Sequence, residues 1–260
     1  MDKQIKLKLI VVKVGGKILE TPDMMTTFLD KFARIEGLKL LVHGGGRSAT
    51  RIAERLGIET KMVDGRRITD APMLEVVTMV YGGLVNKNTV AALQARGVNA
   101  IGLTGADMNI IESDKRPAAA IDYGYVGDVR RVNAGALALL LNNGFTPVIA
   151  PLTHNGHGQM LNTNADTVAA SVAQALSESY DVSLVYCFEK AGVLSDPDDD
   201  NSAIPELTVE SYARLRKEGA ISGGMIPKLD NAFQCISAGV KEVVITRADA
   251  IATHTGTRIH

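Results

Sequence analysis

The chain has 260 residues, of which 46% are hydrophobic and 22% are charged, and its formal net charge at pH 7 is −1. This balance is typical of a globular protein and gives no electrostatic reason to expect nucleic acid or an acidic membrane surface as a partner. The absence of Trp and the small numbers of Phe and Tyr, five and six, argue against a base-stacking surface. No apolar run is long enough to span a membrane, and the first residues, MDKQIKLKL, do not resemble a signal peptide.

The two cysteines, Cys187 and Cys235, lie in apolar patterns and lack the spacing of a metal site. Cysteines in such patterns usually pack as small apolar side chains. Reduced, buried thiols favour a cytoplasmic protein.

Glycine turns follow the first two predicted strands. The strand at 5–14 runs into Gly15-Gly16, and the strand at 38–43 runs into Gly44–Gly46, after which a helical pattern opens at Ser48. A strand, a glycine turn and a helix in succession leave free backbone N–H groups at the positive end of the helix dipole, which favours an anion. Because glycine has no Cβ, a ligand can approach this backbone closely. The sequence therefore predicts that Gly44–Gly46 holds a negatively charged small molecule.

Strands and helices alternate along the rest of the chain, which predicts an α/β protein with a mostly parallel sheet. We expect one domain with two lobes that meet near 163–180. The expected helices are 22–37, a long one at 72–95 with Gly82-Gly83 inside it, 134–141, 167–176, 208–217 and one that follows Gly223-Gly224. The further expected strands are 99–103, 147–150, 183–188 and 242–246, with hairpins at 60–69 and 118–132, a polar turn at 154–161, a charged turn at 196–201 and a tail containing Gly256.

Two lysines occupy unusual positions. Lys13 ends an otherwise apolar strand, where an unpaired ammonium group is costly to bury. The ends of parallel strands face the ligand crevice of α/β proteins, so Lys13 is expected at a site. Lys228 lies in GGMIPKLDNA, where a glycine pair precedes a helix. From this pattern alone, a surface lysine extending into solvent explains Lys228 equally well.

Polar residues also gather before the predicted helix at 167–176. Asn162, Asn164 and Asp166 alternate in LNTNADTVAA, and one of them is expected to cap the helix. A cap does not need all of them, which indicates a site. Arg67, after the Asp64-Gly65 turn, fits a ligand contact or an exposed hairpin residue.

A dinucleotide-binding dehydrogenase is a less favoured alternative. Gly44, Gly46 and Ala49 fit G-x-G-x-x-A, and Asp64 lies at the distance expected of a ribose-binding acid. That acid should end a strand, whereas Asp64 falls in a predicted turn. The sequence contains no G-x-x-x-x-G-K-[ST], which excludes a P-loop protein.

Two patterns resemble metal sites but are incomplete. Asp196, Asp198 and Asp200 resemble the start of a calcium loop, but Asn201 replaces its required glycine and Leu207 its closing glutamate. His154 and His157 have no third ligand nearby in the sequence. We therefore expect no metal site built by the protein.

Six segments stand out when the chain is taken as a whole: VVKVGGK at 11–17, VHGGGR at 42–47, DGRRIT at 64–69, GLTGAD at 102–107, LNTNADTVA at 161–169 and GGMIPKLDNA at 223–232. Taken together and in this order, they resemble the amino acid kinase family, and most closely its acylglutamate branch. The first and last belong to the wider family, which includes aspartate, carbamate and uridylate kinases, whereas HGGGR with GRRIT and NTNAD is particular to the branch. The resemblance covers nearly the whole chain.

The resemblance implies a three-layer αβα sandwich around a mainly parallel central sheet, forming a single domain over 1–260. Its N-terminal lobe, about 1–165, would bind the acylglutamate, and its C-terminal lobe, about 166–260, would bind ATP. The implied reaction is ATP-dependent phosphorylation of the side-chain carboxylate of N-acetyl-L-glutamate in arginine biosynthesis, with N-succinyl-L-glutamate as the alternative. Mg²⁺ would be carried on the ATP phosphates.

Residue roles follow from the matched positions. Lys13 and Lys228 match the lysines that stabilise the transferring phosphoryl group from opposite sides, and Asp166 matches the carboxylate that orients them. Binding of the acylglutamate is implied for Gly45, Gly46, Arg67 and Asn162. The nucleotide site is implied at Gly15, Gly16, Glu189, Lys190, Gly192, Leu194, Ile221, Ser222 and Gly224.

The implied chemistry agrees with these residue types. A carboxylate nucleophile is already ionised at pH 7, so no general base is needed. The barrier is mainly charge repulsion between carboxylate and phosphate, together with alignment, which ammonium groups and backbone N–H donors can lower. A non-enzymatic acylamino-acid or nucleotide sensor on the same fold is the rival hypothesis, and the retained lysine pair argues against it.

The chain also departs from the family pattern. Members usually carry [ST]-D-V-x-G where this chain has Phe188-Glu189-Lys190-Ala191-Gly192, so Glu189 keeps the negative charge on a longer side chain and Lys190 adds a cation. Arginine-inhibited hexameric members have an additional N-terminal helix, whereas few residues precede the first strand here. The expected assembly is therefore a homodimer that arginine does not inhibit.

Overall fold

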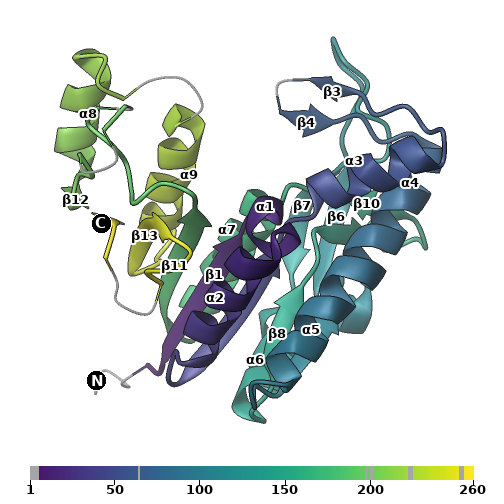
Figure 1. Ribbon diagram of the computed structural model, residues 1–260, viewed down its shortest axis with the longest axis horizontal. Coiled ribbons are helices and arrows are strands. Elements are labelled where there is room, and N and C mark those ends of the chain that lie inside the picture. Colours follow the sequence, from purple (N-terminus) through teal and green to yellow (C-terminus); the bar gives the residue numbers. More distant parts are fainter. Residues whose placement is uncertain (1–5, 64, 197, 200–201, 222–224, 252–254) are drawn as a thin grey trace.

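A computed structural model describes residues 6–63, 65–196, 198–199, 202–221, 225–251 and 255–260. Its central feature is an eight-stranded sheet in these described residues, which Figure 1 shows running through the middle of the molecule. In spatial order its strands are β12 (Glu206–Leu207), β14 (Thr257–Ile259), β13 (Glu242–Arg247), β11 (Asp181–Phe188), β1 (Lys8–Val14), β2 (Leu38–His43), β8 (Thr146–Ile149) and β5 (Ala100–Leu103).

The sheet is mainly parallel, as the sequence predicts. From β13 to β5 every neighbouring pair is parallel, while β14 runs antiparallel to β13. The expected tail around Gly256 therefore contains a strand. Its direction follows from the connection, because β14 begins ten residues after β13 ends, and returning to a parallel position needs a crossover of a dozen or more residues.

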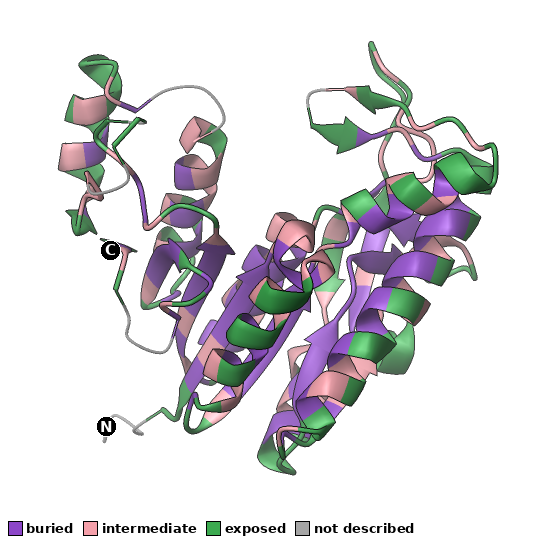
Figure 2. Cartoon of the chain, viewed as in Figure 1, coloured by how far each residue is buried: buried purple, intermediate pink, exposed green. Residues whose placement is uncertain are grey.

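Alternate residues of the central strands face two separate cores. Val11, Leu40 and Leu184 belong to one hydrophobic cluster, whereas their neighbours Val12, Leu41 and Val185 belong to the other. This alternation along each strand places a helical layer on both faces of the sheet. Figure 2 shows the resulting buried strands between helices whose outer faces are exposed.

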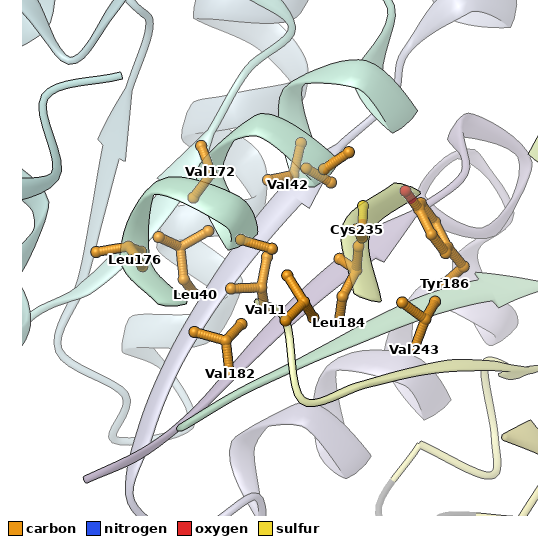
Figure 3. Packing of buried hydrophobic residues seen from close by; sticks show 14 of the residues in the cluster. Val11, Leu40, Val42, Val172, Leu176, Val182, Leu184, Tyr186, Cys235 and Val243 are labelled. Carbon is orange, nitrogen blue, oxygen red and sulfur yellow. The ribbon is translucent and has the colours of Figure 1, made fainter. Parts of the chain in front are cut away.

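The first helical layer is shown in Figure 3, where Val172 and Leu176 of α7 pack over Val11 and Leu40. Its helices are α6 (Ala134–Asn142), α7 (Ala165–Ser177), α8 (Val209–Lys217) and α9 (Met225–Ser237). The second layer contains α1 (Gly16–Glu20), α2 (Pro22–Ala33), α3 (Gly46–Arg55) and the long helix formed by α4 (Ala71–Val77), η1 (Thr78–Val85) and α5 (Asn86–Gln94). The αβα sandwich is confirmed.

The long helix is not broken at Gly82-Gly83. Its middle part, η1, is a π-helix, in which the Asn86 N–H donates to the carbonyl of Tyr81. A Cβ on Gly82 would stand 3.4 Å from side-chain carbons of Leu152 and Thr104, so close packing accounts for this glycine. No described helix combines the length and the apolar character that crossing a membrane would require.

Smaller sheets lie above the carboxyl ends of the central strands, at the upper right of Figure 1. One is the hairpin of β3 (Met62–Val63) and β4 (Arg66–Arg67) that the Asp64-Gly65 turn predicts, although Asp64 itself is outside the described residues. The other contains β6 (Ile111–Lys115), β7 (Gly127–Val132), β9 (Leu152–His154) and β10 (Met160–Asn162), with the short helix η2 (Asp107–Asn109) before β6.

The predicted hairpin at 118–132 is corrected by this sheet, whereas the polar turn predicted at 154–161 is present, with strand residues at its two ends. β7 pairs with β6, while Gly124 instead bridges to Thr69 beside the first hairpin. The mostly polar segment of β6 lacks the apolar run by which the other strands are recognised. The segment at 154–161 forms the turn of the β9–β10 hairpin. The lobe division stays a prediction, since β11 pairs directly with β1 in one continuous sheet.

Candidate active site

The two glycine turns lie against each other at the carboxyl ends of β1 and β2. The Gly44 N–H donates to the Val14 carbonyl at 3.0 Å. A Cβ on Gly16 would stand 3.2 Å from the Gly45 nitrogen, and one on Gly44 would stand 3.0 Å from the Gly16 nitrogen, so side chains would separate the turns. Because α3 begins at Gly46, its first N–H groups lack intrahelical acceptors and favour an anion; that of Ser48 already donates to the Glu20 carboxylate at 2.9 Å.

Lys13 is buried at the end of β1 and forms an ion pair with Asp166. Its Nζ lies 2.8 Å from Asp166 Oδ1, with side-chain exposures of 10% and 27%. Asp166 comes from the first turn of α7, where Asn164 caps the helix by accepting from the N–H groups of Asp166 and Thr167. The cap is thus Asn164, and the Asp166 carboxylate remains available to the lysine.

Lys228 reaches the same place from α9. Its Nζ lies 3.9 Å from the centre of the Phe188 ring, and Lys13 Nζ lies 5.5 Å from that centre. Burial lowers the pKa of Lys228 below its usual 10.5, Asp166 opposes this shift, and Lys13 adds to it. The structure therefore brings both predicted lysines and the predicted carboxylate together.

Asp166 should consequently control the alkaline limit of activity. The role predicted for Lys228 requires its charged form, so kcat should fall as the pH rises through its lowered pKa. Replacing Asp166 with Asn removes the charge that raises this pKa and should move the alkaline limb of kcat to lower pH. A pH profile checks this against Asp181→Asn, a carboxylate paired with Lys241 at the opposite ends of the strands. If the alkaline limb of kcat in Asp166→Asn stayed in place or moved to higher pH, the prediction would be contradicted.

A cavity of about 210 Å³ opens beside the glycine turn. Buried Arg67 donates from Nη2 to the Gly46 carbonyl at 2.8 Å and to Thr50 Oγ1 at 2.9 Å. Asn162 donates to Thr69 Oγ1 at 2.9 Å. Gly45, Gly46, Arg67 and Asn162, all predicted to bind the acylglutamate, therefore share one cavity.

Two further cavities lie on the other side of the lysines, and both include Lys190, Gly192 and Met225 in their walls. Of the predicted nucleotide residues, these walls contain Gly15, Glu189, Lys190, Gly192, Leu194 and Ile221. Gly16 packs on Gly45 instead, at the contact between the turns. Ser222 and Gly224 lie outside the described residues.

Several site residues were missed by the sequence analysis. Lys17 forms an ion pair with Glu189, and both line the cavity that contains Lys228. Tyr81 and Arg116 line the cavity that contains Arg67 and Asn162, and Arg116 forms an ion pair with Asp128. Lys17 directly follows the Gly15-Gly16 turn, and this position is the signal by which it could have been found; it lies in α1, a short helix that the sequence analysis did not predict. Nothing in the local sequence marks Tyr81 or Arg116.

The alternative sites gain no support from the geometry. His154 Nε2 lies 2.7 Å from Asn109 Oδ1, and within the described part of the chain no three His, Cys, Asp or Glu residues are grouped so that they could hold a metal. Asp64, the acid that a dehydrogenase would need, is among the residues not described.

Comparisons with known proteins agree with this arrangement. The model of the amino acid kinase family matches residues 8–247. A Bacteroides fragilis protein named acetylglutamate kinase is 63% identical over 259 residues, which is 100% of this chain and 99% of that protein. The crystal structure of smu.665 from Streptococcus mutans UA159 superposes with a TM-score of 0.76 at 29% identity, covering 96% of this chain and 98% of that one.

A more distant structure shares the fold. N-acetylglutamate synthase from Neisseria gonorrhoeae, complexed with coenzyme A and N-acetyl-glutamate, superposes with a TM-score of 0.79 at 23% identity. The match covers 97% of this chain and 59% of the synthase chain. At this identity the likeness concerns the fold alone.

Proposed function

This chain belongs to the amino acid kinase family, and on that premise we propose that it transfers the γ-phosphoryl group of ATP to the side-chain carboxylate of an N-acyl-L-glutamate. The observation that carries the proposal is the Lys13–Asp166 pair beside Lys228, set between the cavity of Arg67 and the cavity of Glu189. The name of the 63% identical relative favours N-acetyl-L-glutamate as the acceptor, and with it a step of arginine biosynthesis.

Each group has a part in this reaction. Arg67 and Asn162 would hold the acylglutamate so that its ionised side-chain carboxylate faces the glycine turns. Lys13 and Lys228 would neutralise the phosphoryl oxygens as negative charges approach one another. Asp166 would orient Lys13 and keep Lys228 charged. Transfer breaks the bond between the γ-phosphorus and its bridging oxygen and forms an acyl phosphate and ADP.

Magnesium would arrive with the nucleotide. Asp166 and Glu189, two acidic residues of the site, are each paired with a lysine rather than grouped as metal ligands. This suits Mg²⁺ that is held mainly by phosphate oxygens and water, because Mg²⁺ gives up water reluctantly. When bound, the ion would neutralise charge on the phosphates. The two lysines would neutralise the transferring phosphoryl oxygens, and Arg67 and Asn162 would hold the acylglutamate.

The acyl group can be larger than acetyl. Arg66 lines the cavity in addition to Arg67, whereas Arg116, also in its wall, is already paired with Asp128, so one positive group is present beyond the one assigned to the glutamate carboxylate. An acyl group with its own carboxylate, such as succinyl, could contact Arg66. N-succinyl-L-glutamate is therefore the alternative acceptor.

Trapping the acyl phosphate as its hydroxamate tests the proposal. The intact chain is incubated with MgATP and either N-acetyl- or N-succinyl-L-glutamate, and the kcat/KM ratio identifies the acyl group. Turnover of either acceptor supports a kinase. If neither reacts while ATP still binds, a sensor is the better description; NAD(P) binding would point to the dehydrogenase.

A cytoplasmic homodimer completes the proposal. The long helix exposes Met79 and Leu84, about half of each side chain, five residues apart on its π-helical part. Residues five apart lie about one turn apart in such a segment, so both can contribute to one apolar face that a second copy would cover. Light scattering of the purified chain checks this, and a monomer mass would contradict it.

A further inference from the structure

His43, the last residue of β2, is completely buried directly behind the glycine turn. Its ring nitrogens both have partners: Nδ1 lies 2.8 Å from the Gly44 carbonyl oxygen, and Nε2 lies 3.1 Å from Asn86 Nδ2. Burial lowers the pKa of His43 from 6.5 to about 4, so the ring is neutral under ordinary conditions. The residues assigned above to substrate binding and to phosphoryl transfer do not include His43.

The partners fix which nitrogen of His43 carries the proton. A carbonyl oxygen can only accept and an amide NH₂ group can only donate. Nδ1–H therefore donates to Gly44, and Nε2 accepts from Asn86. Asn86 Nδ2 also donates to the Val148 carbonyl of β8 at 2.9 Å, which holds the amide in this orientation.

The bond to Gly44 controls an adjacent N–H group. The Gly44 carbonyl and the Gly45 N–H belong to one planar trans peptide, in which the two groups point in opposite directions. Fixing the carbonyl toward His43 therefore directs the Gly45 N–H away from it. The Gly45 nitrogen lies at the contact with Gly16, where the acylglutamate and nucleotide sides meet.

The π-helix η1 brings Tyr81 next to the glycine turn and Asn86 next to His43. Tyr81 and Asn86 are joined by the i to i+5 hydrogen bond of η1, so they lie about one turn apart on the same face. In an α-helix five residues make about 1.4 turns, and the two would diverge. Here Asn86 contacts His43, and Tyr81 lies so near Gly45 that a Cβ there would be 2.8 Å from the Tyr81 ring.

We propose that His43, held by Asn86 of the long helix, is a positioning residue that sets the direction of the Gly45 N–H toward the transferring phosphoryl group. The inference rests on the proposed kinase function. The π-helical turn is then the support that keeps the glycine turn in its active geometry, with Tyr81 beneath Gly45 and Asn86 behind His43.

Two substitutions, each of which introduces an amide side chain, test the two hydrogen bonds of His43 separately. Asparagine carries its amide at the distance of Nδ1 from the backbone, so His43→Asn can still donate to Gly44. Glutamine carries its amide at the distance of Nε2, so His43→Gln can keep Asn86 but loses Gly44. We expect kcat of H43Q to fall on the order of tenfold or more, because a small misplacement of a reacting group is costly. H43N should stay closer to the native value, and KM for ATP should change little in both.

A role in stability alone would give a different result. Both variants lose one buried hydrogen bond, so both should have a lower Tm, and a merely structural His43 would give them equal kcat. Equal kcat values, or a larger loss in H43N, would overturn the proposal. If the native chain has no kinase activity, the proposed function fails instead, and the same comparison is made on acylglutamate affinity by calorimetry.

A measurement on the native chain does not depend on either variant folding. Long-range ¹H–¹⁵N spectra report the protonated nitrogen of each histidine, and through-bond correlation from the ring to the assigned backbone of His43 identifies its signal. The proposal expects the proton on Nδ1 at pH 7. A proton on Nε2 would remove the bond to Gly44 and overturn it.

Discussion

Replacing Lys13 or Lys228 with methionine is expected to lower kcat on the order of a hundredfold or more, because each ammonium group would stabilise charge that develops during phosphoryl transfer. Methionine keeps the length and apolar part of the side chain, so the packing on Phe188 is largely retained. Steady-state kinetics of the hydroxamate reaction provide the measurement.

The matched control is Lys241→Met. Lys241 is an exposed lysine paired with Asp181 where β11 begins, away from the glycine turns. This substitution removes the same positive charge, and no change in kcat is expected. Near-native kcat in both active-site variants would refute the assigned roles of the lysines, whereas loss in only one would show that the two sides of the phosphoryl group are unequal.

Arg67→Lys should mainly weaken acylglutamate binding. The guanidinium donates to the Gly46 carbonyl and Thr50 Oγ1 through Nη2, and at longer distances to Thr60 Oγ1 and Met73 Sδ through Nη1, so a substrate carboxylate would meet Nε or replace the longer Nη1 contacts. A lysine cannot make these contacts in the same geometry. Since hydrogen bonds to charged groups contribute about 1.5–3 kcal/mol, KM for the acylglutamate should rise by roughly tenfold to a hundredfold, with KM for ATP nearly unchanged.

Arg55→Lys is the companion variant, because Arg55 is an exposed arginine in the last turn of α3, the helix that Arg67 contacts at its start. It should leave both KM values unchanged. If Arg67→Lys raised KM for ATP as much as KM for the acylglutamate, Arg67 would maintain the structure of the whole site rather than bind the acylglutamate specifically.

The candidate site was predictable where a local pattern carries the chemistry. Lys13 is unusual at the end of an apolar strand, and Gly44–Gly46 stand between a strand and a helix. Both signals depend on residues adjacent in sequence. The Asn162–Asp166 segment was predicted as a group, but the sequence could not tell which residue caps α7 and which one pairs with Lys13, because both Asn and Asp can cap a helix.

The errors in the fold have a related cause. β6 and β14 are short strands with few apolar residues, so no apolar run marks them in the sequence. The segment at 118–132 contains turn-forming glycines, yet Gly124 pairs with Thr69 rather than within its own segment. Strand pairing between distant segments is decided by the packing of the whole sheet.

The sequence alone determined the α/β class, the position of the anion-binding turn and, through its motifs, the resemblance to one family of kinases. Only the tertiary structure decided that Lys228 joins Lys13 and Asp166, that Lys17 pairs with Glu189, and that Asn86 supports His43. Periodicity and turn residues act over a few neighbouring positions, whereas these contacts join residues far apart in the sequence, 43 positions for the Asn86–His43 pair and 172 for the Lys17–Glu189 pair. Such contacts exist because parallel strands end at one edge of the sheet and bring distant loops together there.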